Sequence, residues 1–504
     1  MSSSDQLPDR MNPNLYILVA LALVTLAVCF VCGCSVNGRA MRFDPQAQNS
    51  AKGRSWFIEG KTHNGASVSC SFVEFDERGD YIDFNQHRDC EQRIAEYVRS
   101  GKVLLVIYCH GWKNSSQSGD VNQFNTFLSR LADSDEIRGQ GLRVHGVYLG
   151  WRGNLFRPYV DKDPDTAINR QINDVFGESI VDRKFHRRWH FTWMVPENLT
   201  YWNRKNAAEQ RVSALPIARA IFTYASAAKA YGNRLDNRVV VMGHSFGALL
   251  LERGLGQGMT GAITMEWWDK EHKEQTLHKP GLPFDLVLFV NSAAPAIYAK
   301  EMRDFLMADR KSKARDHKVD GDVPVIVSIT STGDKATGVL HPIGNAFAPF
   351  LPSLKRKYTS GILGLPVNGV YPQHHPIRQS VFYTKTPGHH PYLLNHWIVS
   401  DKSTPDLGQP PDDAFKANLS LSVKDPDLFW TSHPRSAWRI SQHSPSGDQL
   451  FYGLPPSMPD ANYWIVTCGS ALIKDHNDVW SDTAMEMYAG VFRACELRRR
   501  RTEQ

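Results

Sequence analysis

Apolar and polar positions alternate along the chain from Ser55 onward in two periods, one typical of strands and one typical of helices. Residues 102 to 109 (KVLLVIYC) form an apolar run without a polar face, which predicts a strand buried on both sides. Residues 121 to 132 follow with the spacing of an amphipathic helix, and residues 143 to 149 are strand-like again. Such alternation is typical of a mostly parallel sheet covered by helices on both faces. The predicted fold class is therefore α/β.

The same pattern extends the predicted sheet in both directions. Further strands are predicted at residues 237–242, 284–290, 323–330 and 462–468. An alanine-rich stretch, residues 207 to 231, predicts a helix before the first of these strands. Upstream, the turn signal Asp-Glu-Arg-Gly-Asp at 76 to 80 separates residues 67–75 from residues 81–84. We expect these two stretches to open the sheet as an antiparallel hairpin.

Near the N-terminus, residues 15 to 36 form an uncharged apolar run that is long enough to cross a bilayer as a helix. The run contains Phe-Val-Cys-Gly-Cys at 30 to 34, which resembles a bacterial lipobox and implies a periplasm-facing lipoprotein that is lipidated at Cys34. An uncleaved single-pass anchor is the alternative, because the preceding residues lack the net positive charge of an export signal. A buried core helix is the third interpretation. Residues 1 to 36 are thus predicted as a signal or anchor segment, and residues 37 to 54 as a flexible tether.

Composition narrows the class of protein further. With 504 residues, 42% of them hydrophobic and 22% charged, the chain is long enough for a large core and is typical of neither a disordered chain nor a polytopic membrane protein. The net charge is +6, but Arg498 to Arg501 supply four of these charges, so nucleic acid is not an expected partner. The eight cysteines include no pair at zinc-ligand spacing. Cys70 and Cys90, which flank the predicted hairpin, are a candidate disulfide if the body is exported.

A Gly-x-Ser-x-Gly motif, Gly243-His244-Ser245-Phe246-Gly247, directly follows a predicted strand. The alanine and leucines after it predict a helix, which completes the strand-turn-helix context of a nucleophile elbow. The sharp turn requires the two glycines, since side chains there would collide with the neighbouring strand and helix. We therefore predict that the Ser245 hydroxyl is exposed at the carboxyl edge of the sheet, at the positive end of a helix dipole. A glycine-rich turn with a capping serine is the alternative.

Acyl transfer by a serine also needs backbone donors for the oxyanion. His110-Gly111-Trp112 directly follows the apolar strand at 102 to 109, where hydrolases with this kind of elbow have their oxyanion loop. We predict the backbone N–H groups of Trp112 and Phe246 as the two donors. His110 is predicted to brace the loop rather than to transfer a proton.

A catalytic base, and an acid that orients it, are expected after the later strands. Asp334 lies in a Ser-Thr-Gly-Asp sequence directly after the penultimate predicted strand, and we predict it as the acid, with Glu301 and Asp304 as reserves. A turn-forming aspartate beside glycine is the alternative interpretation of Asp334. His476 follows closely on the last predicted strand, and the chain order Ser, Asp, His selects it as the base.

Two long segments interrupt the alternation, residues 154 to 206 and residues 338 to 461. Connections of this length are uncommon in a compact α/β unit unless they have a function. We expect both to be cap insertions over the active-site edge of the sheet. Aromatic residues in the second insertion suit a lid or the wall of an acyl pocket, with a subdomain packed away from the site as the alternative. They are Phe347, Phe350, Tyr371, Phe382, Tyr383, Tyr392 and Trp397.

Three histidines of the second insertion are candidates either to line the pocket or to bind a metal, namely His389, His390 and His396. Their spacing matches no metal motif closely, so we predict no metal site. The expected organisation is one domain over residues 55 to 497, with both insertions inside it, followed by a basic tail at 498 to 504.

On these motifs the chain resembles the α/β-hydrolase superfamily, specifically bacterial serine esterases and lipases with a His-Gly-Trp oxyanion motif and a Gly-His-Ser-Phe-Gly nucleophile turn. The resemblance covers roughly Ser67 to Ala489. It implies an eight-stranded sheet, a triad of Ser245, Asp334 and His476, no cofactor, and hydrolysis of an ester. The segment GVYLGWRG at 146 to 153 also looks like a feature shared by uncharacterised members, and we expect it to line the site.

The leading hypothesis is a membrane-tethered serine hydrolase that cleaves a carboxylic ester, with a small ester or a lipid-like molecule as substrate. Thioesterases and acyltransferases share the acyl-enzyme step, and the sequence does not separate them from esterases and lipases. A non-catalytic adhesion or scaffold protein on the same fold is the hypothesis from another class. An intact triad beside an intact oxyanion loop argues against it.

Overall fold

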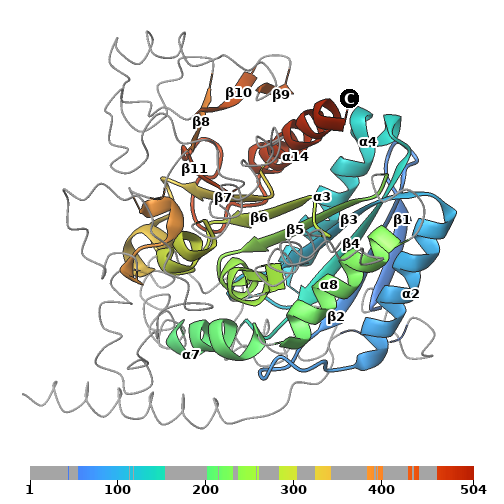
Figure 1. Ribbon diagram of the computed structural model, residues 1–504, viewed down its shortest axis with the longest axis horizontal. Coiled ribbons are helices and arrows are strands. Elements are labelled where there is room, and N and C mark those ends of the chain that lie inside the picture. The colour runs from blue at the N-terminus through green and yellow to red at the C-terminus, as the bar shows by residue number, and fades with distance from the viewer. Residues whose placement is uncertain are drawn as a thin grey trace, which may run out of the picture.

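A single mixed sheet organises the part of the chain that the computed structural model describes. That part is residues 42, 44, 55–112, 114–116, 118–153, 201–213, 215–230, 236–256, 258–259, 283–303, 324–341, 383–390, 393, 396–400, 429–433, 436–441 and 463–503. The strands are β1 (Phe57–Lys61), β2 (Ser67–Glu74), β3 (Lys102–Cys109), β4 (Leu142–Gly150), β5 (Arg238–His244), β6 (Leu286–Val290), β7 (Ile326–Ser331), β8 (His396–Ser400), β9 (Phe429–His433), β10 (Ser436–Ser441) and β11 (Tyr463–Cys468). They are ordered β1-β2-β4-β3-β5-β6-β7-β11-β8-β10-β9 across the sheet (Figure 1).

The centre of the sheet is parallel. Every neighbouring pair from β2 across to β8 runs in the same direction, whereas β1 at one edge and β10 and β9 at the other are antiparallel to their neighbours. Parallel strands bring their carboxyl ends to one edge, where ligand sites of α/β proteins lie. The predicted α/β class with a mostly parallel sheet is confirmed.

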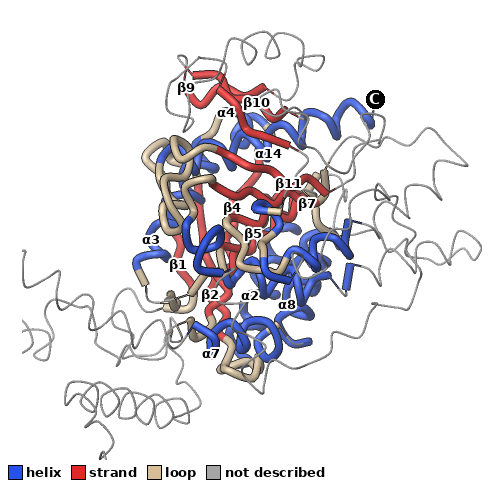
Figure 2. Tube along the Cα trace, turned by 90° about the vertical axis from the view of Figure 1, so that its left-hand side faces the viewer, coloured by secondary structure: helices blue, strands red, loops and turns tan. Residues whose placement is uncertain are grey.

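Helices cover both faces of the sheet (Figure 2). The named helical elements are α2 (Phe84–Ser100), α3 (Gly119–Asp133), α4 (Asp135–Gly139), α7 (Tyr201–Asn206), η1 (Ala207–Val212), α8 (Leu215–Ala230), η2 (Ala336–Leu340), η5 (Pro387–His389) and α14 (Asp482–Glu503), and a further helix spans residues 246 to 256. On one face, α2 and α8 pack with the 246–256 helix through Ile94, Ile221 and Leu251. On the other face, α3 and α14 pack through residues such as Phe124 and Tyr488. The three-layer arrangement follows from strands that are apolar on both sides.

The opening hairpin differs from the prediction. Strand β2 confirms the strand predicted at 67–75, but its antiparallel partner is β1, which lies upstream and leaves residues 62 to 66 as the turn. Residues 81–84 contribute only an isolated bridge from Tyr81 to Phe75 before α2 begins. The reason is a helix cap, because the Asp83 side chain accepts a hydrogen bond from the backbone N–H of Asn85 at 2.9 Å.

The sheet is also wider than the eight strands implied by the resemblance. Strands β8, β9 and β10 come from the segment 338–461, so part of this predicted cap widens the sheet instead of covering it. Most of the rest of that segment, and the insertion before residue 201, lie outside the described residues. So do the predicted lid aromatics, apart from Tyr383 and the backbone of Trp397. Residues 498 to 503, predicted as a basic tail, continue α14.

The candidate disulfide is absent, because Cys70 and Cys90 are both free thiols. Cys70 on β2 belongs to the core on the α3 side of the sheet, whereas Cys90 on α2 belongs to the core on the opposite side. Alternation along β2 turns Cys70 away from α2. Burial raises the pKa of Cys70 to about 12, so its thiol stays protonated and unreactive at neutral pH.

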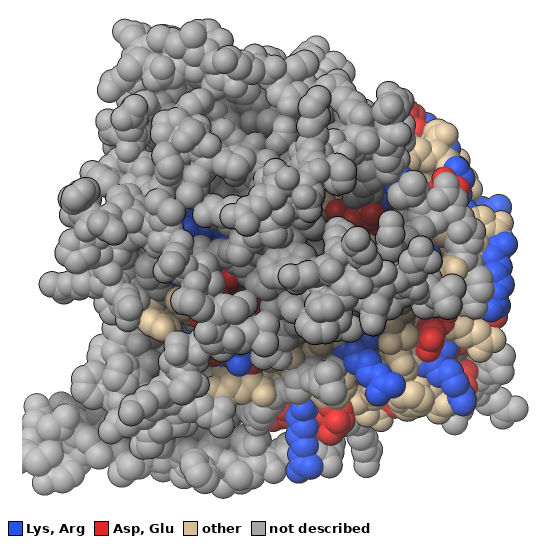
Figure 3. All heavy atoms as spheres, viewed as in Figure 1, with Lys and Arg blue, Asp and Glu red and all other residues tan. Residues whose placement is uncertain are grey.

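Acidic and basic side chains are intermixed over the described part of the face shown in Figure 3. Some opposite charges on the described surface are paired, as Arg143 is with Glu59 and Arg138 with Asp135. Because exposed pairs of this kind contribute on the order of 0 to 1 kcal/mol, the two apolar cores rather than surface charges hold the fold together.

Candidate active site

Ser245 lies in a sharp turn between β5 and the helix at 246–256. Its φ of 55° is in the left-handed region, which is uncommon for a residue other than glycine. A Cβ on Gly243 would come within 2.9 Å of the Cα of Ala248, and a Cβ on Gly247 within 2.2 Å of the carbonyl oxygen of Cys109. The predicted collisions are therefore present. A side chain at position 243 would meet the helix, and a side chain at position 247 would meet the end of β3. Ser245 lies at the apex of this turn, but only 3% of the residue is exposed, so the prediction of an exposed hydroxyl is wrong.

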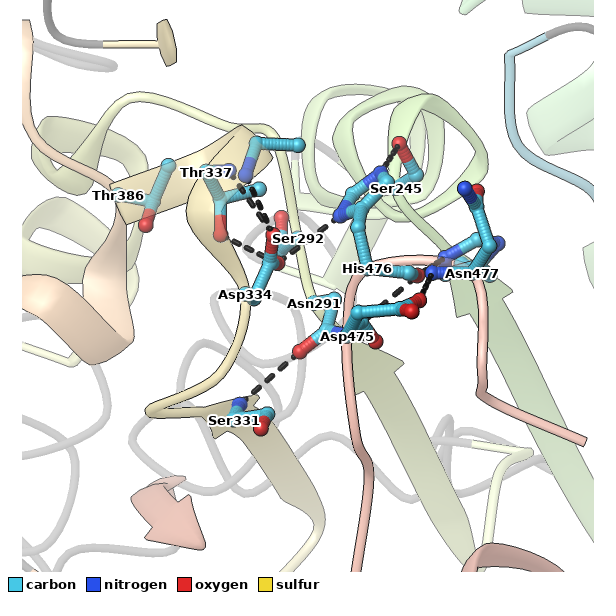
Figure 4. Close-up of polar contacts among 12 residues, drawn as sticks. Ser245, Asn291, Ser292, Ser331, Asp334, Thr337, Thr386, Asp475, His476 and Asn477 are labelled. Atoms are coloured by element: carbon cyan, nitrogen blue, oxygen red, sulfur yellow. Dashed lines mark hydrogen bonds and ion pairs between the residues drawn. The ribbon is translucent and has the colours of Figure 1, made fainter. Parts of the chain in front are cut away.

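The structure brings Ser245, His476 and Asp334 into one hydrogen-bonded line (Figure 4). The Oγ of Ser245 lies 2.7 Å from Nε2 of His476, and Nδ1 of His476 lies 2.9 Å from Oδ2 of Asp334. These residues follow the carboxyl ends of β5, β11 and β7, so the parallel sheet gathers side chains that are far apart in sequence. Since a carboxylate only accepts, Nδ1 of His476 carries the proton and Nε2 faces the serine hydroxyl as an acceptor.

Asp334 is held as a carboxylate. Its side chain is fully buried, and Oδ2 accepts from the Oγ1 of Thr337 as well as from His476. Oδ1 accepts from the backbone N–H groups of Ala336 and Thr337 at 2.9 Å and 3.0 Å. Burial alone would raise the pKa of Asp334, but these hydrogen bonds outweigh burial and lower the pKa to about 2. The Asp334 side chain is thus ionised at any pH near neutrality. It is also part of a turn, so the two sequence interpretations of Asp334 are compatible.

His244 holds the loop that carries His476. Its Nε2 donates to the backbone carbonyl of His476 at 2.8 Å. Burial lowers the pKa of His244 to about 3, so the ring is neutral and places no positive charge beside the triad. His244, the second residue of the Gly-His-Ser-Phe-Gly motif, therefore positions the loop of His476.

Asn291 is a residue of the site that the sequence did not single out. It follows β6 directly, is completely buried, and has a φ of 45°. Its Oδ1 accepts from the backbone N–H of Ser331 at 3.0 Å, and its Nδ2 donates to the backbone carbonyls of Asp475 and His476 at 3.4 Å and 3.5 Å. Asn291 thereby ties the end of β7 to the loop of His476 (Figure 4). Its position at the end of an apolar run, like that of Ser245, was the available signal.

The predicted oxyanion loop lies against the serine. A Cβ on Gly111 would come within 2.9 Å of the Cβ of Ser245, so only glycine allows the backbone this close. The rings of Trp112 and Phe246, the two predicted donors, have centroids 6.0 Å apart. The structure therefore places both residues near Ser245. Trp112 is on the loop after β3, and Phe246 is the first residue of the helix after Ser245.

His110, which the sequence predicted to brace this loop, is hydrogen-bonded to Trp151 at the end of β4. The backbone N–H of Trp151 donates to Nε2 of His110 at 3.1 Å, and the indole N–H of Trp151 donates to the carbonyl of His110 at 2.9 Å. Burial lowers the pKa of His110 to about 4, so the ring is neutral. A Cβ on Gly153 would come within 2.9 Å of the carbonyl oxygen of Gly111. The segment 146–153 was expected to line the site, and its end contacts the predicted oxyanion loop at His110 and Gly111.

The remaining candidates have distinct outcomes. His389 packs on Gly338, and a Cβ at position 338 would come within 2.8 Å of the Nε2 of His389. Burial lowers the pKa of His389, although the negative charge of Asp334 acts in the opposite direction. His390 is buried, whereas the side chain of His396 and the whole of Asp304 lie outside the described residues. Asp334 is the predicted acid that contacts His476, at 2.9 Å. Among the described residues no group of three or more His, Cys, Asp or Glu side chains is arranged to hold a metal ion.

The N-terminal apolar run and Cys34 lie outside the described residues. Within the part of the chain that is described, no helix combines the length and the apolar character needed to cross a bilayer. Comparison of the chain with models of known families, with curated proteins and with solved structures finds no match.

Proposed function

We propose that this chain has the α/β-hydrolase fold and is a serine hydrolase that cleaves carboxylic esters through an acyl-enzyme. The observation that carries the proposal is the line from Ser245 Oγ through His476 to Asp334, built at a strained turn. Strain of this kind persists only where the surrounding structure enforces it, and it concentrates at functional sites. A scaffold protein would have no use for a serine held this way.

The proposed reaction begins when Nε2 of His476 accepts the proton of Ser245 as Oγ attacks the ester carbonyl carbon. Asp334 keeps the proton on Nδ1 and stabilises the imidazolium that forms. The backbone N–H groups of Trp112 and Phe246 would bind the oxyanion of the tetrahedral intermediate. His476 then protonates the departing alcohol, and water, deprotonated by the same nitrogen, attacks the acyl-enzyme to release the acid and regenerate Ser245.

We also propose that the N-terminal segment tethers this body to a membrane through lipidation of Cys34. The support is the apolar run at 15–36 and the lipobox-like sequence at its end. A lipidated N-terminus with several acyl chains gives stable association, whereas one short chain gives only reversible binding. If Cys34→Ser leaves both the membrane fraction and the protein mass unchanged, the uncleaved anchor replaces the lipoprotein in this proposal.

Ester hydrolysis tests the proposed function directly. We expect the full chain to hydrolyse a series of p-nitrophenyl esters, and Asp334→Asn to reduce kcat by about 10³ to 10⁴ because the wrong imidazole tautomer then faces Ser245. The folding control is Thr337→Ser, which keeps the hydroxyl donor to Asp334. The absence of hydrolysis across short and long acyl chains, or full activity of Asp334→Asn, would refute the proposal.

A further inference from the structure

Arg42 is buried against the body, although it lies in the segment predicted as a flexible tether. Only 5% of the residue is exposed. Its Nε donates to the backbone carbonyl of Ser116 at 2.7 Å, and its backbone N–H donates to Oε2 of Glu74 at 3.0 Å. The guanidinium carbon lies 3.9 Å from the centroid of the Phe72 ring. The contacts therefore come from both the side chain and the main chain of Arg42.

The residues that contact Arg42 also bind one another. The Nε2 of Gln86 donates to Oε2 of Glu74 at 3.0 Å and to the backbone carbonyl of Arg42 at 3.4 Å, and the Oγ of Ser116 donates to Oε1 of Glu74. A buried arginine is costly unless its charge and hydrogen bonds are matched. Here Nε and Nη1 of Arg42 donate to the backbone carbonyls of Ser116 and Ser55 at 2.7 Å and 3.4 Å, and its backbone N–H donates to Glu74. The chain is therefore attached to the body at this point.

The attachment lies on the same edge of the sheet as the triad. Glu74 is the last residue of β2, and Ser116 belongs to the loop that leaves the carboxyl end of β3. Gly111, on that same loop, abuts Ser245. Ser116 lies five positions after Gly111, which limits the distance between them along the chain to at most about 18 Å. Arg42 therefore docks beside the oxyanion loop.

Attachment at Arg42 shortens the chain between the proposed lipidation site and the body. From Cys34 to Arg42 the chain can extend by at most about 29 Å, whereas from Cys34 to Ser55 it could extend by about 75 Å. With the longer tether the body could present any face to a bilayer. With the shorter tether the carboxyl edge of the sheet is the edge that stays next to the anchor.

We infer that Arg42 holds the Ser245 edge of the sheet toward the membrane, so that the substrate is an acyl ester presented by lipids of that same bilayer. This inference rests on the proposed membrane attachment and on the proposed hydrolysis. It assigns Arg42 a role in orienting the body, outside the catalytic machinery.

Energy transfer to the bilayer tests the orientation without relying on activity. The full chain would be reconstituted in phosphatidylcholine and phosphatidylglycerol vesicles that carry acceptor dyes on their headgroups. A fluorescent amino acid would replace either Thr332, which is exposed just beyond the carboxyl end of β7, or Ser100, which is exposed just before the amino end of β3. We expect stronger transfer from position 332 than from position 100.

Two insertions of the same 20-residue Gly-Ser segment form a matched pair. One is placed between Gly38 and Arg39, upstream of Arg42, and the other between Gln48 and Asn49, downstream of it. We expect the upstream insertion to abolish the difference in transfer between positions 332 and 100, and the downstream insertion to preserve it. Only the upstream insertion lengthens the chain between Cys34 and Arg42, so attachment at Arg42 predicts this difference.

Equal transfer from the two positions, or equal effects of the two insertions, would overturn the inference while leaving the attachment intact. Protein that does not float with the vesicles would overturn both. Hydrolysis of a soluble short-chain ester is measured alongside, and we expect it to be the same in all variants. An ester embedded in the vesicles should be hydrolysed at least several-fold more slowly by the upstream variant alone. If no protein hydrolyses the soluble ester but the expected differences in energy transfer are present, the proposed hydrolysis is wrong and the orientation stands.

Discussion

The indole of Trp151 lies parallel to the imidazole of His110, with the ring centroids 5.7 Å apart and the planes within 8° of each other. Because the backbone N–H of Trp151 donates to Nε2 of His110, the ring proton is on Nδ1, which lies 2.9 Å from the carbonyl of Gly111. The histidine thus links the end of β4 to the loop that abuts Ser245. This contact gives the segment 146–153 a physical role that its sequence alone did not reveal.

Replacing Trp151 by Phe should impair catalysis more than folding. The variant keeps the backbone donor to His110 Nε2 but loses the indole donor to the His110 carbonyl. Direct loss of one oxyanion donor costs about 10² to 10³ in kcat. Because the effect of Trp151 is indirect, we expect about a 10-fold fall in kcat with KM unchanged, measured on a soluble ester.

Trp480→Phe is the matched control for that variant. Trp480 is also buried, and its indole N–H donates to Asp120 at 2.6 Å on the α3 side of the sheet. We expect Trp480→Phe to lower the free energy of unfolding and to leave kcat unchanged. Equal losses of kcat in the two variants would show that Trp151 acts only through overall stability.

Asn291→Asp should reduce kcat more than Asn291→Ala does. The aspartate can still accept from the backbone N–H of Ser331, but it replaces the amide that donates toward the carbonyls of Asp475 and His476. A carboxylate oxygen facing two carbonyl oxygens is repelled, so the His476 loop should shift. We expect kcat to fall about 10-fold in Asn291→Ala and further in Asn291→Asp, although neither variant changes Ser245 itself. Wild-type kcat in the aspartate variant would mean that the loop is held by other contacts.

Glu252 should make the protein less stable as the pH rises. Burial raises the pKa of its carboxyl from 4.5 to about 8, although the Ser292 hydroxyl, which donates to Oε1 at 2.6 Å, opposes the shift. The folded protein then retains a proton that the unfolded chain has lost, so the unfolding free energy falls between about pH 4.5 and pH 8. Glu252→Gln should remove most of this slope in denaturant titrations at pH 5, 7 and 9. Glu91→Gln on the exposed surface of α2 is the control, and an unchanged slope in Glu252→Gln would refute the assignment.

Most of the sheet, and the approach of Ser245, His476 and Asp334 to one another, could be predicted because they depend on local patterns. Ser245, Asp334 and His476 each follow an apolar run that indicates a strand, and parallel strands collect their carboxyl ends at one edge. Asn291 follows such a run too, but its role depends on a loop nearly two hundred residues away, which no local pattern reveals.

The sequence predictions that were wrong also have physical causes. Asp83 followed by Gln86 is a helix-start signal that outweighs the strand-like character of residues 81–84. The short apolar strand β8 is embedded in a segment rich in proline and glycine, which concealed its pairing with β11. Cys70 and Cys90 are only twenty residues apart, yet the sheet lies between them.

The most direct test of the central claim is to identify the residue that a fluorophosphonate probe modifies. A hydroxyl activated by His476 and Asp334 should attack the phosphorus and displace fluoride, leaving a stable adduct on Ser245 that peptide mass spectrometry can locate. Ser245→Ala, which should also lower ester hydrolysis by several orders of magnitude, is the variant to compare. We expect one modified serine, Ser245, in the wild-type protein and none in the variant. Labelling of Ser245→Ala to the same extent as the wild-type protein, or a wild-type adduct on another residue, would contradict it.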